Sequence, residues 1–215
     1  MKNIGFKRAV KTAFFPARCP YCDIVIDPER YACADCGADL PEIPVISYIE
    51  GGFRCVSPFL YTDCYAEAVK RFKFSGRAQY SEQLAFAVVT ALNCSGDLGF
   101  DYVTCVPMHR DQKIERGYNQ SELLAKDCAA LLGLAYLDLL EKFKRNKIQH
   151  ELKGKERRAN VKGVYRTVNT DKLKGKRVLL IDDIITTGNT MRECAVTLKK
   201  GGCAEIKCAA ICYVN

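Results

Sequence analysis

The stretch of sequence that says most about the fold is Val178-Leu179-Leu180-Ile181-Asp182-Asp183-Ile184-Ile185-Thr186-Thr187-Gly188-Asn189-Thr190. Its aliphatic residues 178–181 predict a short buried strand, and residues 191–200, closed by Gly201-Gly202, predict a helix after the turn. A turn between a strand and the start of a helix gathers free backbone N–H groups, and the helix dipole adds to their attraction for an anion. The stretch therefore predicts a phosphate site in an α/β fold.

The polar residues of this stretch suit the two ends of a sugar phosphate. Gly188 lets the backbone approach a ligand closely, and the threonine hydroxyls add donors for a phosphate monoester. Asp182 and Asp183 can accept hydrogen bonds from sugar hydroxyls or support Mg²⁺. A strand followed by a helix that a threonine caps is the plainer alternative, but it leaves the two adjacent acids unexplained. No lysine occupies the P-loop position, which argues against ATP hydrolysis in the P-loop manner.

Helix and strand patterns alternate through the rest of the chain. Apolar spacing and glycine stops predict helices over residues 64–73, 84–92 and 119–132. Short apolar runs predict strands over residues 102–106 and 206–213. Alternation of this kind is typical of a mostly parallel sheet with helices on its faces.

Four of the thirteen cysteines form two close pairs, Cys19-Pro20-Tyr21-Cys22 and Cys33-Ala34-Asp35-Cys36. Two residues between two thiolates let both sulfurs face one cation, and two such pairs complete a closed tetrahedral shell for Zn²⁺. A redox pair, the alternative, needs a thioredoxin-like setting that the sequence around Cys19 lacks. The other nine cysteines are interpreted as reduced, buried thiols of a cytosolic core.

The cysteine pairs predict a small N-terminal module, and Pro41 and Pro44 mark its end. We therefore predict a zinc-binding module over residues 1–45 and an α/β domain over residues 46–215. The metal would be structural, because a segment of roughly 40 residues builds no sufficient core alone. The sequence holds no apolar run long enough for a membrane span and no secretory signal, so we expect a cytoplasmic protein.

Positive charge is concentrated in one segment. The chain has a net charge of +8, and residues 141–166 hold ten basic and three acidic residues, an excess of seven. A basic segment of this kind predicts a polyanionic partner, either a polyphosphate or a nucleic acid. A solvated loop rich in lysine is the alternative, and charge alone leaves both open.

Residues 178–190 resemble the phosphoribosyl-diphosphate (PRPP) signature of type I phosphoribosyltransferases. Other short motifs follow in an order that, with the cysteine pairs, resembles the ComF family over nearly the whole chain. These motifs are Lys73-Phe74-Ser75-Gly76, Val106-Pro107-Met108-His109, Arg116-Gly117-Tyr118-Asn119-Gln120 and Gln149…Leu152…Arg157…Asn160…Gly163-Val164-Tyr165. The resemblance implies a type I phosphoribosyltransferase-like parallel sheet with flanking helices and a small zinc-binding module.

The resemblance also assigns roles within the site. It implies that Asp182 and Asp183 hold the ribose and that Mg²⁺ accompanies PRPP. The 5′-phosphate would lie on Thr186, Thr187, Gly188, Asn189 and Thr190. Arg116 begins a segment that we expect to follow the strand at 103–106 and to open a helix. It is our candidate partner for the diphosphate.

The basic segment allows two interpretations. The segment could close over the diphosphate as a flap, or it could follow a DNA backbone. The basic residues that would make these contacts are Arg145, Lys147, Arg157 and Arg158. Phe143 and Tyr165 flank the segment and could stack on bases, although aromatic residues at such positions more often belong to a core.

Two functions of different classes remain. The resemblance implies a PRPP-binding accessory protein of DNA uptake and natural transformation that binds single-stranded DNA, with a DNA-translocating helicase as a partner. The alternative is an active transferase that displaces diphosphate from PRPP onto an unknown nucleophile. In purine-salvage transferases of this fold, the position of Thr186 is commonly an acid that acts near the base. A threonine is no general base, which disfavours purine salvage.

Overall fold

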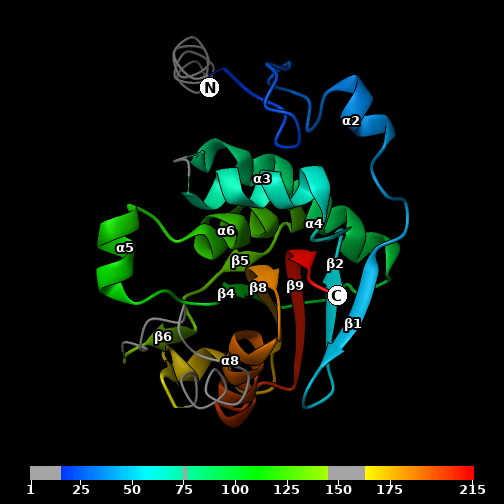
Figure 1. Ribbon diagram of the computed structural model, residues 1–215. Coiled ribbons are helices and arrows are strands. Elements are labelled where there is room, and N and C mark those ends of the chain that lie inside the picture. The colour runs from blue at the N-terminus through cyan, green and yellow to red at the C-terminus, as the bar shows by residue number, and fades with distance from the viewer. Residues whose placement is uncertain (1–15, 75–76, 145–162) are drawn as a thin grey trace, which may run out of the picture.

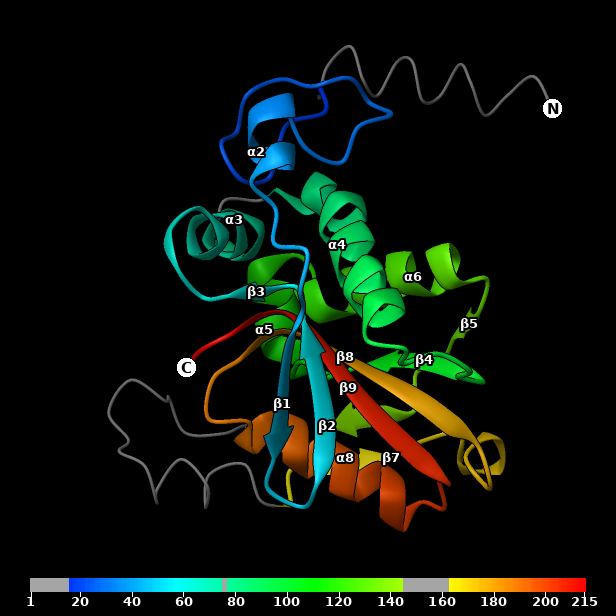
Figure 2. The same cartoon turned by 90° about the vertical axis from the view of Figure 1, so that its right-hand side faces the viewer.

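The computed structural model describes residues 16–74, 77–144 and 163–215, and they form an α/β fold. A seven-stranded sheet runs in the order β1-β2-β9-β8-β4-β5, with β3 also beside β9. Every neighbouring pair in it is parallel except the β1–β2 hairpin at its edge (Figures 1 and 2). The strands are β1 (Val45–Ile49), β2 (Phe53–Ser57), β3 (Phe59–Leu60), β4 (Tyr102–Cys105), β5 (Ala135–Tyr136), β8 (Arg177–Ile185) and β9 (Glu205–Tyr213).

Helices cover both faces of this sheet, as Figures 1 and 2 show. One face carries α3 (Asp63–Phe74), α4 (Ser81–Cys94) and α6 (Gln120–Leu132), and the other carries α8 (Asn189–Lys200). The remaining elements are α2 (Ala34–Ala38), η1 (Ala78–Tyr80), α5 (Arg110–Arg116), η3 (Thr170–Lys172) and the antiparallel pair β6 (Leu140–Lys142) and β7 (Tyr165–Thr167).

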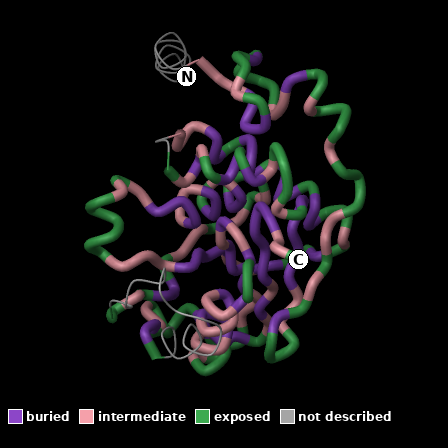
Figure 3. Tube along the Cα trace, in the orientation of Figure 1, coloured by how far each residue is buried: buried purple, intermediate pink, exposed green. Residues whose placement is uncertain are grey.

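The central strand β8 shows why the sheet is buried on both sides. Leu179 and Ile181 pack into the hydrophobic cluster under α4 and α6, while Val178 and Leu180 pack into the cluster under α8. Successive side chains of a strand point to opposite faces, so an unbroken aliphatic run serves two cores. In Figure 3 the buried segments accordingly run through the middle of the molecule.

The N-terminal module packs onto the same core. Tyr21 meets the ring of Phe59 edge-on at 5.6 Å and that of Tyr65, in α3, at 5.7 Å. The Arg71 guanidinium donates a hydrogen bond of 2.7 Å to the Pro20 carbonyl. The module is therefore held to α3 and to the start of β3 by aromatic packing. The division into two domains at residue 45, where β1 begins, stays a prediction.

The helices and strands that the sequence predicts are all present, and one of them differs in length in a way that matters for the site. The strand expected over residues 178–181 continues to Ile185, because β9 supplies partners as far as Tyr213. Asp182 and Asp183 consequently lie inside the strand rather than after it. The hairpin β1–β2, helix α5 and the pair β6–β7 were not predicted. Across the described ranges, no helix has both the length and the apolar character that a membrane crossing requires.

Candidate functional site

The site is organised around two acids near the carboxyl end of β8. The half-buried Asp182 accepts a hydrogen bond of 2.7 Å from Ser121 Oγ, at the start of α6, and one of 2.9 Å from the Asp183 backbone N–H. Burial, followed by the neighbouring charge of Asp183, raises the pKa of Asp182 to about 7. This carboxyl group therefore exchanges its proton near neutral pH.

Asp183 is buried and is paired with a lysine from a distant part of the chain. The Lys73 ammonium, at the end of α3, lies 2.9 Å from Asp183 Oδ2. Burial acts to lower the pKa of Lys73, but the charge of Asp183 and its hydrogen bond outweigh burial, so this pKa lies above its ordinary value. The end of α3 is fixed by the Tyr118 hydroxyl, which donates to the Phe72 carbonyl at 2.6 Å.

The loop after β8 leads into an open helix end. No side chain of the described residues caps the N-terminus of α8, which begins at Asn189 after Gly188. Thr186 and Thr187 are exposed beside it, so they do not act as the caps that the plainer alternative required. The first N–H groups of α8 thus have no side-chain partner among the described residues, and two exposed threonines precede them, as an anion site needs.

Gly188 is required at the turn for two reasons. Its φ of +69° lies in the left-handed region, and a Cβ atom added there would lie 2.5 Å from Ile49 Cγ2. The backbone of the loop therefore packs directly against Ile49 at the end of β1. This contact sets how closely the start of α8 approaches β1.

A pocket of about 430 Å³ opens beside the acid pair. It is lined by Lys73, Phe74, Gln112, Glu115, Arg116 and Tyr118. The Arg116 guanidinium lies over the Phe74 ring at 5.4 Å and donates to Gln120 Oε1 at 3.2 Å. Two cations thus face one pocket next to Asp183.

The segment that begins at Arg116 opens α6, as the sequence predicted, but Arg116 itself ends a helix that was not predicted. It is the last residue of α5, Gly117 ends that helix with a φ of +86°, and Asn119 caps the next helix by accepting a hydrogen bond of 3.2 Å from the Ser121 N–H. The chain folds this way because glycine alone readily takes the left-handed conformation that stops a helix.

The strand pair β6–β7 carries further basic residues. Burial lowers the pKa of Lys142, while the nearby Cys194 and Asp182 act in the opposite direction. Phe143 is 40% exposed, and its ring has Lys144 and Arg166 within 5.3 and 5.5 Å. Tyr165 is buried instead, as the core interpretation held. The predicted flap residues Arg145, Lys147, Arg157 and Arg158 lie outside the described residues.

The four paired cysteines come together in one cluster. The sulfur atoms of Cys19, Cys22, Cys33 and Cys36 all lie within 4.8 Å of one another. The Cys36 N–H donates to Cys33 Sγ at 3.3 Å, and this bond lowers the pKa of Cys33 and favours its thiolate. Four sulfur donors at such distances fit a closed tetrahedral Zn²⁺ site, and this cluster could hold a metal such as zinc.

Sequence reasoning missed two residues that contact the acid pair, Lys73 and Ser121. Lys73 stands in a motif that carried the family resemblance, but no role was assigned to it. Ser121 is two residues beyond the expected helix start, where nothing local marks it as a partner of Asp182. Their roles depend on which elements lie side by side in the sheet.

Comparison with known proteins agrees with this geometry. Residues 119–215 match the phosphoribosyl transferase domain. The DNA utilization protein YhgH of Salmonella typhimurium is 28% identical over 90% of this chain and 83% of its own length. Competence protein F of Haemophilus influenzae is 28% identical over 87% of this chain and 82% of its own length.

Among solved structures, the adenine phosphoribosyltransferase of Thermoanaerobacter pseudethanolicus is 15% identical and covers 82% of this chain and 98% of its own, with a TM-score of 0.41. The resemblance to competence proteins that the motifs predicted is confirmed by the relatives.

Proposed function

We propose that this protein, which carries a phosphoribosyl transferase domain and has homologues named for competence and DNA utilization, binds PRPP and acts on single-stranded DNA during its uptake. One observation carries the proposal. The acid pair of β8 leads, within one short loop, to the uncapped N-terminus of α8, with Lys73 and Arg116 on the other side of the acids. Acceptors for a sugar thus lie between two groups of anion-binding donors.

Each part of PRPP has a matching group in this arrangement. The 5′-phosphate would accept hydrogen bonds from the N–H groups of α8 and from residues 186–190, since a helix N-terminus favours a phosphate. The ribose hydroxyls would donate to Asp182 and Asp183. The diphosphate would extend into the pocket of Lys73 and Arg116. Asp182 and Asp183 would hold Mg²⁺, which would supply positive charge to balance the diphosphate.

The Lys73 ammonium would change its partner when PRPP binds. In the described state the Lys73 ammonium neutralises Asp183. A diphosphate in the adjoining pocket would attract the same ammonium and leave Asp183 to the ribose. Lys73 would therefore hold the acid in the empty site and the ligand in the filled one.

DNA binding is supported by the surface at β6–β7. An exposed aromatic ring between two cations, as Phe143 is between Lys144 and Arg166, suits a base that stacks and a phosphate that is neutralised. The basic segment over residues 141–166 would contact the phosphates of the DNA backbone. A helicase partner and a cytoplasmic location stay predictions.

Salt dependence tests this part of the proposal. Affinity for single-stranded DNA should fall with salt along a log–log slope of about −0.7 per phosphate contact. Replacing Arg157 and Arg158 with alanine should make the slope shallower, while Lys70→Ala, on the exposed side of α3 across the sheet from β6–β7, should leave it unchanged. If the intact protein binds no single-stranded DNA at low salt, the DNA-binding part of the proposal is wrong. PRPP binding is then tested separately by the titration described below.

The cysteine cluster would hold one structural Zn²⁺. We propose Cys19, Cys22, Cys33 and Cys36 as its ligands, since four protein donors leave no open position for catalysis. The metal would keep Tyr21 packed against Phe59 and α3.

A second candidate function is transfer of the phosphoribosyl group. The pocket of about 430 Å³ has room for an acceptor as well as the diphosphate, and a carboxyl group whose pKa is about 7 suits proton transfer at neutral pH. Release of diphosphate from PRPP in the presence of a panel of nucleophiles, measured beside DNA binding at two salt concentrations, decides between the two functions.

A further inference from the structure

A run of polar residues at the start of α6 donates side-chain hydrogen bonds to other segments of the chain. The run is Tyr118-Asn119-Gln120-Ser121. Tyr118 is half-buried, and the other three residues are no more than 5% exposed. Buried polar groups are nearly always paired, because an unpaired one keeps its desolvation penalty. The partners of these side chains therefore show which groups the start of α6 holds in place.

Gln120 contacts both residues that supply cations to the diphosphate pocket. Its Nε2 atom donates to the Lys73 carbonyl at 3.1 Å, and its Oε1 atom accepts a hydrogen bond of 3.2 Å from Arg116 Nη1. A carbonyl only accepts and a guanidinium only donates, so this orientation of the amide satisfies both partners. One buried amide thus joins the end of α3 to the end of α5.

The contact with Lys73 fixes the end of α3. The last carbonyl groups of a helix have no partner within it, and the carbonyls of Phe72 and Lys73 lie in the last turn of α3. The Tyr118 hydroxyl donates to the first of them at 2.6 Å, and Gln120 donates to the second. The backbone position of Lys73 is therefore set by the start of α6.

Ser121 serves the acid on the other side of the site. Its Oγ atom donates to Asp182 Oδ1 at 2.7 Å, and the Asp183 backbone N–H donates to the same oxygen at 2.9 Å. Among the described residues, no hydrogen bond falls on Asp182 Oδ2. Ser121 therefore fixes the carboxyl group by one oxygen and leaves the other for a ligand.

The two neighbours serve different sides of the site because they are successive residues of a helix. Side chains one residue apart on a helix are turned by about 100° from each other. Gln120 consequently reaches α3 and α5, whereas Ser121 reaches β8.

We propose that the two are positioning residues for different halves of PRPP. Gln120 sets Lys73 and Arg116 for the diphosphate, and Ser121 sets Asp182 for the ribose. This inference rests on the proposed function, because it assigns parts of the same ligand to the same site.

Titration calorimetry with two fragments of PRPP, inorganic diphosphate and ribose 5-phosphate, tests the division. Gln120→Met should weaken binding of diphosphate at least about tenfold and leave binding of ribose 5-phosphate unchanged. Ser121→Ala should weaken binding of ribose 5-phosphate at least about tenfold and leave binding of diphosphate unchanged. Diphosphate is titrated without added Mg²⁺, so that its affinity reports the two cations rather than the acids.

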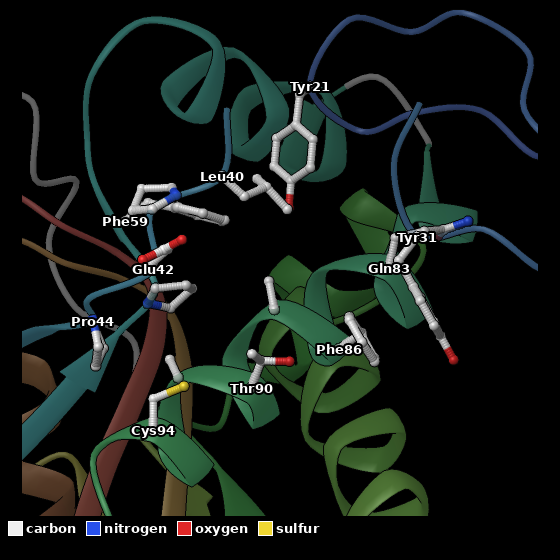
Figure 4. A pocket seen from close by; sticks show the side chains of 14 residues that line it. Tyr21, Tyr31, Leu40, Glu42, Pro44, Phe59, Gln83, Phe86, Thr90 and Cys94 are labelled. Carbon is white, nitrogen blue, oxygen red and sulfur yellow. The ribbon is translucent and has the colours of Figure 1, made fainter. Parts of the chain in front are cut away.

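A matched control separates positioning from packing. Gln83 is also a buried glutamine on a helix, and in Figure 4 it lies with Tyr31 and Phe86 in the wall of a different pocket. That pocket has no lining residue in common with the diphosphate pocket. Gln83→Met should therefore leave the affinities for both fragments unchanged.

A second variant covers the case in which Gln120→Met does not fold, as judged by circular dichroism. Gln120→Glu keeps the size of the side chain and an acceptor for Arg116, but it has no donor for the Lys73 carbonyl. It should likewise weaken binding of diphosphate and leave binding of ribose 5-phosphate unchanged.

The possible failures are distinguishable. If the parent protein binds PRPP but each variant changes the two fragments alike, or changes neither, the division is wrong and the proposed function stands. The same holds if the parent binds PRPP but neither fragment at millimolar concentration, or if Gln83→Met weakens either fragment. If the parent binds no PRPP, the proposed function and this inference are both wrong.

Discussion

The Lys73 ammonium lies 2.9 Å from Asp183 Oδ2, and this contact joins the end of α3 to the end of β8. The lysine is partly exposed and the carboxylate is buried, so the pair forms the border between the sheet and the pocket of Arg116. An ion pair at such a border is open to exchange, because a more highly charged anion in the pocket competes for the cation.

Lys73→Met should weaken PRPP binding and destabilise the empty protein by about 1–3 kcal/mol, since it leaves a buried carboxylate without its partner. Chemical denaturation and PRPP titration measure the two effects. Lys70→Met is the matched control on the same helix, because its pair with Glu67 lies on the exposed face. Unchanged PRPP affinity in Lys73→Met would exclude the lysine from the ligand site.

Asp182 gives the protein a specific pH dependence. Its pKa is about 7 in the folded state, well above the ordinary value of 3.8, so the folded state holds a proton that the unfolded state has released. The stability from this group is complete below about pH 4 and is lost as pH rises through about 7. The parent should lose stability as pH rises from about 6 to about 8, and Asp182→Asn should not. The difference in unfolding free energy should therefore shift in favour of the variant over this range.

The measurement is the denaturation free energy of both proteins across this pH range. The same deprotonation should strengthen binding of PRPP with Mg²⁺ as pH rises from about 6 to about 8, since a carboxylate accepts hydrogen bonds that a carboxylic acid does not. A stability difference between parent and variant that does not change with pH would contradict the assignment.

Gly188→Ala should destabilise the protein more than Gly96→Ala. The φ angles of the two glycines are nearly equal, +69° at Gly188 and +71° at Gly96. An added Cβ at Gly188 would lie 2.5 Å from Ile49, whereas one at Gly96 would have no atom within 4 Å. The difference should be about 1–3 kcal/mol, the usual cost of overpacking. Denaturation of the two variants gives it directly. Equal losses would mean that the loop moves freely away from β1.

Cys36→Ser should remove bound zinc and lower the melting temperature, because the metal replaces the missing core of the module. Cys64→Ser is the control, since that thiol is exposed and outside the cluster. Metal analysis of the purified variants measures the zinc content, and a full equivalent of zinc in Cys36→Ser would exclude this ligand.

The parts of the site that the sequence predicts are the local ones. Four cysteines in two short spacings bring their own sulfurs together, and a strand, a loop and a helix in succession bring their own N–H groups together. The β1–β2 hairpin was not predicted, although its Gly51-Gly52 turn is a local signal: two glycines between apolar runs are typical of a tight hairpin.

The parts that sequence reasoning missed depend on long-range pairing. β8 continues through Asp182 because Ala210 of β9 lies opposite it, which no local pattern around the acids reveals. Lys73 becomes a site residue only because α3 ends above β8. Arg116 belongs to the same pocket, and its position at the end of α5 follows from a glycine stop that the sequence did contain.

The most direct test of PRPP binding is titration calorimetry of PRPP with Mg²⁺ on the parent protein and on the variant Asp182→Asn/Asp183→Asn. Asparagine keeps the size of each side chain, so circular dichroism and zinc content should match those of the parent. We expect one PRPP per parent chain and an affinity at least about 100-fold lower in the variant, because two charged acceptors are lost. Equal affinity of the two proteins, or no binding of PRPP by the parent, would contradict this expectation.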